Sequence, residues 1–209
     1  MPDVEHSRRF CFIKNFFIKM ERKIIDEIIR NRRSVFPEMY EDREIDDETI
    51  LNIIENATWA PNHKLTEPWH FVVFKKNSLE KLSNFLGKHY KESTPEEKFS
   101  EMKYKKILSK PLKSACMVAV CYRKGPQNRV PEQEELLAMG AAIENFWLTC
   151  SAYGIGCYLS TTSAINHIGE LADLQEGERC VGLFYMGWRK PCELTGTRSD
   201  YRQKISWIS

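Results

Sequence analysis

Hydrophobic residues recur along this chain at two spacings, and each spacing predicts a type of element. Apolar side chains three and four residues apart are typical of amphipathic helices, whereas short continuous runs rich in β-formers are typical of buried strands. The first spacing predicts helices that begin at Met20 and Asp46, and helices at residues 78–90, 95–110, 131–153 and 163–174. The second predicts strands at residues 69–75, 115–122, 156–160 and 180–186.

The predicted strands are interleaved with the predicted helices, which indicates an α+β or α/β fold with helices covering a sheet. No Gly-, Pro- or Ser-rich linker divides the 209 residues, so we expect one domain. The apolar patch within residues 1–19 is broken by Lys14, Asn15 and Lys19, and it lacks the continuous apolar region of a signal peptide. We expect residues 1–19 to be a dispensable extension and residues 20–209 to form the domain.

Composition and charge exclude several classes of protein. Lys and Arg number 31 against 29 Asp and Glu, so the net charge of +2 gives no reason to expect a partner nucleic acid. No run of about 18 apolar residues is present, so a membrane-spanning helix is not expected. The seven cysteines include no C-x-x-C pair and no histidine at metal spacing, which favours buried thiols in a reducing cytoplasm and no metal site.

Arg32, Arg33 and Ser34 follow a stripe of isoleucines, within residues 24–29, on the first predicted helix. Their spacing continues the face that we expect to point inward, where a guanidinium needs an anionic partner with oxygen acceptors. A phosphate meets that need, and the serine hydroxyl can donate to the same oxygens. The alternative is a solvated helix end at which cations complement the helix dipole.

A second candidate is the polar loop between Pro61 and Pro68, which contains His63 and Lys64. Because proline restricts the backbone at both ends, the loop is expected to present these two side chains in a fixed position. The alternative is that they are ordinary solvated polar surface.

The ordered combination of motifs along the chain resembles the flavin-dependent nitroreductase family, from about Lys23 to the C-terminus. The version of the loop, Ala-Pro-Asn-His-Lys, is similar to the short single-domain branch, in which Ala-Pro-Asp-His-Lys occurs. The motifs are Arg32-Arg33-Ser34, Ala60-Pro61, Pro68-Trp69-x-Phe71-Val72-Val73, the long Gly- and Ala-bearing helix, Gly154-x-Gly156 and Gly182-x-x-x-x-Met186-Gly187.

This resemblance implies a nitroreductase-like α+β fold with a mostly antiparallel central sheet flanked by helices. It also implies an intertwined homodimer with two FMN molecules at its interface. By position, the residues implied at the FMN phosphate and ribityl chain are Arg32, Arg33, Ser34 and the late basic residue Arg198. Those implied along the flavin ring are Tyr158, Leu159 and Ser160, with Trp59 and His63 coming from the other subunit. Two alternatives are that Arg198 is simply tail charge and that Tyr158 belongs to the core.

Two positions depart from the family pattern. Many relatives carry a basic residue two positions after the early serine, where this chain has Phe36, and the common Gly-Asn-x-Gln-Pro-Trp loop is replaced at residues 64–69. A positive or hydrogen-bonding group near the flavin ring stabilises its anionic reduced form. Our hypothesis is that His63, Lys64 or Arg33 compensates for the missing groups.

If FMN is present, the cofactor carries the chemistry, and we identify no catalytic side chain. The expected reaction is ping-pong transfer of electrons from NADH or NADPH to a small-molecule electron acceptor such as a nitroaromatic or quinone. Gly154-Ile155-Gly156 is not a dinucleotide fingerprint, so the nicotinamide is expected to bind transiently. Two other classes stay open: a module that holds FMN with little turnover, and a flavin-free interaction protein.

Overall fold

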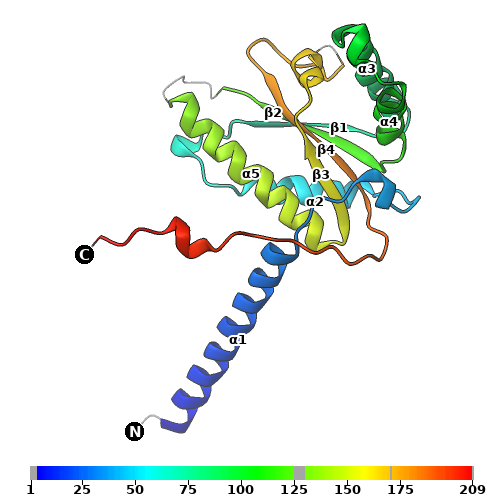
Figure 1. The fold of residues 1–209 in the computed structure, drawn as a ribbon. Coiled ribbons are helices and arrows are strands. Elements are labelled where there is room, and N and C mark those ends of the chain that lie inside the picture. Colours follow the sequence, from blue (N-terminus) through cyan, green and yellow to red (C-terminus); the bar gives the residue numbers. More distant parts are fainter. Residues whose placement is uncertain (1–3, 125–129, 170, 209) are drawn as a thin grey trace.

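The centre of the fold is an antiparallel four-stranded sheet with the strand order β1-β2-β4-β3 (Figure 1). The computed structural model describes residues 4–124, 130–169 and 171–208, with side chains from residue 18 onward. The strands are β1 (Trp69–Phe74), β2 (Cys116–Tyr122), β3 (Ile155–Ser160) and β4 (Arg179–Trp188). All four lie where the apolar runs predict them, and the α+β fold with an antiparallel sheet is confirmed.

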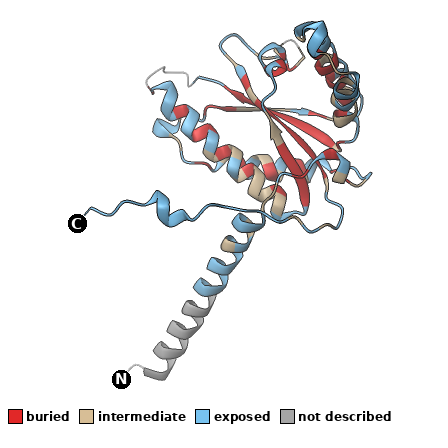
Figure 2. Ribbon diagram, viewed as in Figure 1, coloured by how far each residue is buried: buried red, intermediate tan, exposed pale blue. Residues whose placement is uncertain are grey.

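Helices cover both faces of this sheet. Helices α2 (Asp47–Thr58) and α5 (Glu132–Ala152) pack on one face, and α3 (Asn77–Ser93) packs on the other with α4 (Glu101–Leu112) beside it (Figure 1). Each covering helix contributes an apolar stripe, as the spacing of its residues requires. The strands are accordingly buried over most of their length (Figure 2).

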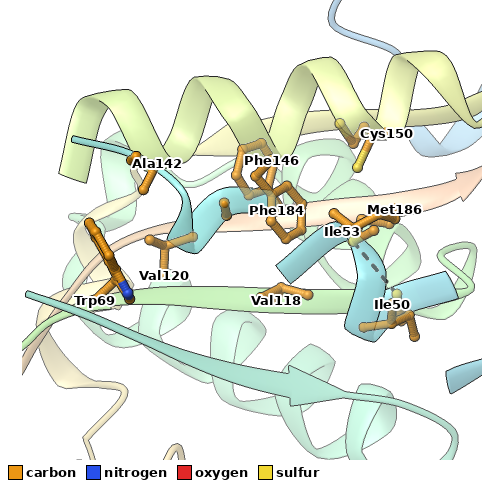
Figure 3. Packing of buried hydrophobic residues seen from close by; sticks show 14 of the residues in the cluster. Ile50, Ile53, Trp69, Val118, Val120, Ala142, Phe146, Cys150, Phe184 and Met186 are labelled. Carbon is orange, nitrogen blue, oxygen red and sulfur yellow. Dashed lines mark hydrogen bonds between the residues drawn. The ribbon is translucent and has the colours of Figure 1, made fainter. Parts of the chain in front are cut away.

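The core consists of two clusters, one on each side of the sheet, and β2 contributes to both. Val118 faces α2 and α5, whereas Met117 faces the α3 side. This burial on both faces explains why the sequence of β2 is apolar without alternation. On the α5 side, Phe146 stacks on Phe184 with ring centroids 4.5 Å apart (Figure 3).

Helix α1 (Val4–Asn31) extends away from the rest of the chain and differs from the sequence prediction in two ways (Figures 1 and 2). It begins at Val4 rather than Met20, so residues 4–19 are joined to the domain by continuous helix. Its isoleucine stripe is not inward in the single chain, because Ile24, Ile25 and Ile29 are each about half exposed. The end of the helix reaches α5, and none of the described elements covers the rest of the stripe.

Two other helix predictions need correction. The charged segment at residues 95–110 is divided into a 3-10 turn (Glu96–Lys98) and α4, which begins after the Ser100 cap and runs past Pro111. The helix predicted at residues 163–174 is wrong, because only Ser163–His167 forms a 3-10 helix and turns follow it. Asp173 has a φ of 50°, which interrupts a right-handed helix.

The C-terminal segment after β4 crosses the end of α1 and then leaves the domain (Figure 1). It contains a short 3-10 helix (Tyr201–Lys204), and Trp207 near its end is almost fully exposed. Within the described ranges, no helix combines the length and apolar character needed to cross a membrane. Over the same ranges, no cluster of His, Cys, Asp and Glu is arranged to hold a metal ion.

Candidate functional site

Arginines from the two ends of the domain meet around one cavity of about 530 Å³. Arg30, Arg32 and Arg33 come from the end of α1 and the turn after it, and Arg198 comes from the C-terminal segment. Glu144 of α5 is the single acidic residue in its described lining. The structure therefore brings together Arg32, Arg33 and Arg198, which are far apart in the sequence, and leaves them with an excess of positive charge.

Arg32 is held by two residues of α5. Its Nε lies 3.7 Å from Oε1 of Glu144, and its guanidinium lies 4.4 Å from the centre of the Trp147 ring. The side chain is only 16% exposed, so these contacts fix its direction. Sequence analysis missed this support, although Glu144 and Trp147 stand one helical turn apart on the same face of α5.

The side chain of Arg33 is held by hydrogen bonds to nearby backbone carbonyl groups. Its Nη1 donates to the carbonyl oxygens of Arg30 (2.6 Å) and Arg32 (2.8 Å). Its Nε is buried without a hydrogen-bond partner in the described part of the chain. The tail lies directly against this guanidinium, because a Cβ added at Gly196 would come within 2.5 Å of Arg33 Cζ. An unsatisfied buried donor beside other cations is the environment in which a bound anion is stabilised.

The turn after α1 is joined to the edge strand β3. Ser34 forms an isolated parallel bridge with Cys157, and the Val35 N–H donates to the Cys157 carbonyl oxygen at 3.1 Å. The arginine cluster is therefore connected to the start of the predicted ring-binding segment, residues 158–160. Ser34 itself is exposed, as a group that must contact a ligand has to be.

The three predicted ring-binding residues of β3 face different surroundings. The buried Tyr158 ring stacks on Tyr185, with centroids 4.7 Å apart, on the α3 side of the sheet. Leu159 packs toward the α5 side, where it fills the space above Gly182. Ser160 is partly exposed and lines a second cavity together with Tyr158. The Tyr158 side chain thus belongs to the core, as its alternative interpretation states.

His63 lies apart from the arginine cluster within one chain, and the neighbouring Trp59 is strongly exposed. Nδ1 of the half-exposed His63 is 2.5 Å from Oε2 of Glu134, in the first turn of α5, and Trp59 is 79% exposed. Glu134 and Glu144 are separated by ten residues of helix, or about 15 Å at 1.5 Å per residue. One chain therefore presents the predicted site as two separate groups.

The loop that carries His63 has an unusual backbone. Lys64, Leu65 and Glu67 adopt φ values of 54°, 52° and 43°, in the left-handed region that residues with a side chain rarely occupy. The Glu67 N–H donates to Oδ1 of Asn62 at 3.1 Å and closes the loop. Such conformations are concentrated at functional sites, and here they fix the direction in which His63 is presented.

Phe36 stands at the position where the family pattern has a basic residue in many members, and its ring contacts another aromatic ring. Phe36 lies against Tyr158 with ring centroids 4.8 Å apart, and Nζ of Lys110 lies 5.7 Å from the Phe36 ring. Sequence analysis did not select Lys110, because it is distant in sequence and stands among other lysines of a charged helix. Its position near Phe36 depends on the packing of α4, which no local pattern reveals.

Comparisons with known proteins agree with this arrangement. The model of the Nitroreductase family matches residues 29–188. The Bacillus subtilis protein YfhC, provisionally named an NAD(P)H nitroreductase, is 23% identical over 189 residues, or 89% of this chain and 95% of that protein.

Solved structures give the same assignment. The crystal structure of a nitroreductase-like family protein from Bacillus cereus has a TM-score of 0.72 and 27% identity, covering 88% of this chain and 95% of that one. The FMN-dependent nitroreductase NfnB from Mycobacterium smegmatis, solved with NADPH, has a TM-score of 0.70 at 14% identity, covering 90% of this chain and 99% of that one. The predicted family, fold and enzyme class are confirmed. This chain belongs to the nitroreductase family.

Proposed function

We propose that this chain is an FMN-dependent oxidoreductase that transfers electrons from NADH or NADPH to a nitroaromatic, quinone or similar acceptor by a ping-pong reaction. The observation that carries this proposal is the arginine cluster, in which several guanidinium groups face a single carboxylate, that of Glu144. The turn that carries two of these arginines is joined to β3 by the bridge between Ser34 and Cys157. Membership of the nitroreductase family and the printed names of its relatives support the same reaction class.

The residues of the cluster fit a phosphate monoester. Such a group carries close to two negative charges and three acceptor oxygens at neutral pH. Arg32, Arg33 and Arg198 supply several N–H donors around one cavity, including the unpaired Nε of Arg33. We therefore assign the FMN phosphate to these three arginines, with the Ser34 hydroxyl as an additional donor.

FMN, when bound, supplies the group that accepts a hydride from the nicotinamide and then passes the electrons to the acceptor. This chain would contribute binding and orientation: the arginines would hold the phosphate end, and residues 158–160 of β3 would hold the ring. We assign His63, with the neighbouring Trp59, to the site of a second copy of the chain, because the Glu134 partner of His63 stands about 15 Å along α5 from Glu144 of its own arginine cluster. The proposed active form is accordingly a homodimer.

The six described cysteines are free thiols, and five of them are buried. Free thiols persist in reducing compartments, which supports our placement of the protein in the cytoplasm.

The test is the visible spectrum of the purified protein, followed by anaerobic addition of NADH and NADPH in separate cuvettes. We expect flavin absorption bands that bleach with at least one nucleotide and recover when a quinone or nitroaromatic is added. Flavin bands that do not bleach would instead indicate a module that holds FMN without turnover. A protein that shows no flavin bands, even after incubation with excess FMN, would contradict the proposal.

A further inference from the structure

A second cavity, of about 320 Å³, lies between α3, α4 and the end of β3. Its volume is within the range of small-molecule sites. Its lining contains basic, aromatic and hydroxyl side chains and no carboxylate among the described residues. Among its lining residues are Tyr90, Lys103, Lys110, Tyr158, Ser160 and Tyr185.

The two lysines of this cavity have aromatic rings as neighbours instead of acids. Nζ of Lys103 lies 4.9 Å from the centre of the Tyr90 ring, and Nζ of Lys110 lies 5.1 Å from that of Tyr158. Neither lysine forms an ion pair within the described residues. Partial burial and then the neighbouring Lys106 lower the pKa of Lys110, and the charge of Glu38 opposes this only in part. Both ammonium groups thus have unused hydrogen-bond donors.

Hydroxyl groups complete the donor set on the strand side. The Tyr158 ring stacks on Tyr185, and burial raises the pKa of Tyr185 to about 12 and that of Tyr158 well above its ordinary value. The two hydroxyls also share a hydrogen bond, which raises the pKa of Tyr158 and lowers that of Tyr185, so Tyr158 donates to Tyr185 and the Tyr185 hydroxyl is left to donate to a ligand. Ser160 adds a third hydroxyl at the edge shared with the proposed flavin-binding segment. The cavity combines aromatic walls with cationic and neutral donors, which suits an aromatic ligand that carries an anionic group.

We propose that this cavity binds a small aromatic carboxylate, and that such acids are the preferred electron acceptors of this protein. The second half rests on the proposed function, because Ser160 borders both this cavity and the proposed flavin-binding segment. The carboxylate lies at Lys103 and Lys110, and the ring lies against the tyrosines. Charge therefore selects the acceptor, since a neutral analogue of the same shape loses the charge-assisted hydrogen bonds.

The test is calorimetric titration of the purified full chain, with its flavin as isolated, using 4-nitrobenzoate and its neutral analogue 4-nitrobenzamide. We expect the acid to bind about tenfold more tightly than the amide, the ratio that one charge-assisted hydrogen bond provides. Lys103→Gln is expected to remove most of this preference, and the double change Lys103→Gln with Lys110→Gln to abolish it. Lys105→Gln is the matched control, because that exposed lysine of α4 pairs with Glu101, does not line the cavity and should leave the preference unchanged.

Equal affinity for the acid and the amide in the unaltered protein would overturn the proposal. So would an undiminished preference in the double variant, which would place the anion elsewhere. Because binding is read without turnover, these outcomes are independent of the reductase assignment. That assignment is tested in parallel by flavin content and by NAD(P)H oxidation with menadione, a neutral quinone. A protein that lacks flavin yet prefers the acid through Lys103 would refute only the proposed function.

Discussion

At the scale of single residues, Arg32 is the proposed phosphate ligand whose side chain is held by both Glu144 and Trp147. Replacing Arg32 by Ala removes a charge-assisted pair of donors, which contributes about 1.5 to 3 kcal/mol, so FMN should bind roughly ten- to a hundredfold more weakly. Fluorescence titration of the flavin-depleted protein with FMN measures the change. Arg202→Ala is the control, because that exposed arginine pairs with Asp200 outside the cluster. Equal FMN affinity in the Arg32 variant and the control would contradict the assignment.

At the scale of elements, the paired strands β3 and β4 depend on two glycines that make room for Tyr40. A Cβ added at Gly187 would come within 2.5 Å of the Tyr40 ring, and one added at Gly156 would come within 3.1 Å of it. The buried hydroxyl of Tyr40 lies 2.8 Å from the carbonyl oxygen of Val35 and 2.9 Å from that of Tyr185. Both glycines belong to motifs that resemble the family pattern, and their local role here is packing.

We therefore expect Gly187→Ala to lower the free energy of unfolding by about 1 to 3 kcal/mol, the usual effect of overpacking. Urea denaturation followed by circular dichroism measures this change. Gly169→Ala serves as the control, since a Cβ there meets no atom within 4 Å and the expected change is below about 0.5 kcal/mol. If both variants unfold at the same urea concentration, the packing role of Gly187 is wrong.

The spacing of apolar residues predicts correctly those elements whose apolar side chains are buried by other elements of the same chain. The strands and the helices α2, α3 and α5 follow their apolar spacing closely, because each buries its stripe against the sheet. The helix predicted at 163–174 is wrong because its apolar residues, such as Ile165 and Ile168, are buried by a 3-10 helix and the turns after it, so burial at this spacing does not by itself select an α-helix. In the candidate site, the meeting of Arg32, Arg33 and Arg198 follows from motif order, whereas the contributions of Glu144, Trp147 and Lys110 depend on tertiary packing.

At the scale of the whole molecule, a single chain presents an incomplete surface. The isoleucine stripe of α1 projects beyond the domain, and apolar side chains in such a contiguous arrangement mark an interface (Figure 2). Trp59 and His63 are exposed, and the Glu134 partner of His63 stands ten residues along α5 from Glu144 of the arginine cluster. A second copy of the chain that covers the stripe would explain both observations. It would bury the isoleucines and bring its own Trp59 and His63 to the arginine cluster of the first copy.

We therefore expect oligomeric state and flavin binding to depend on the same residues. The double change Ile25→Glu with Ile29→Glu places charges on the stripe, so we expect it to convert dimers to monomers and to reduce flavin content together. Light scattering after size-exclusion chromatography measures the mass, and the absorbance ratio of flavin to protein measures occupancy. Met102→Glu, at an exposed apolar position on α4, should change neither. A variant that becomes monomeric but keeps full flavin occupancy would show that each chain completes its own site, and Trp59 and His63 would then have to be removed from it.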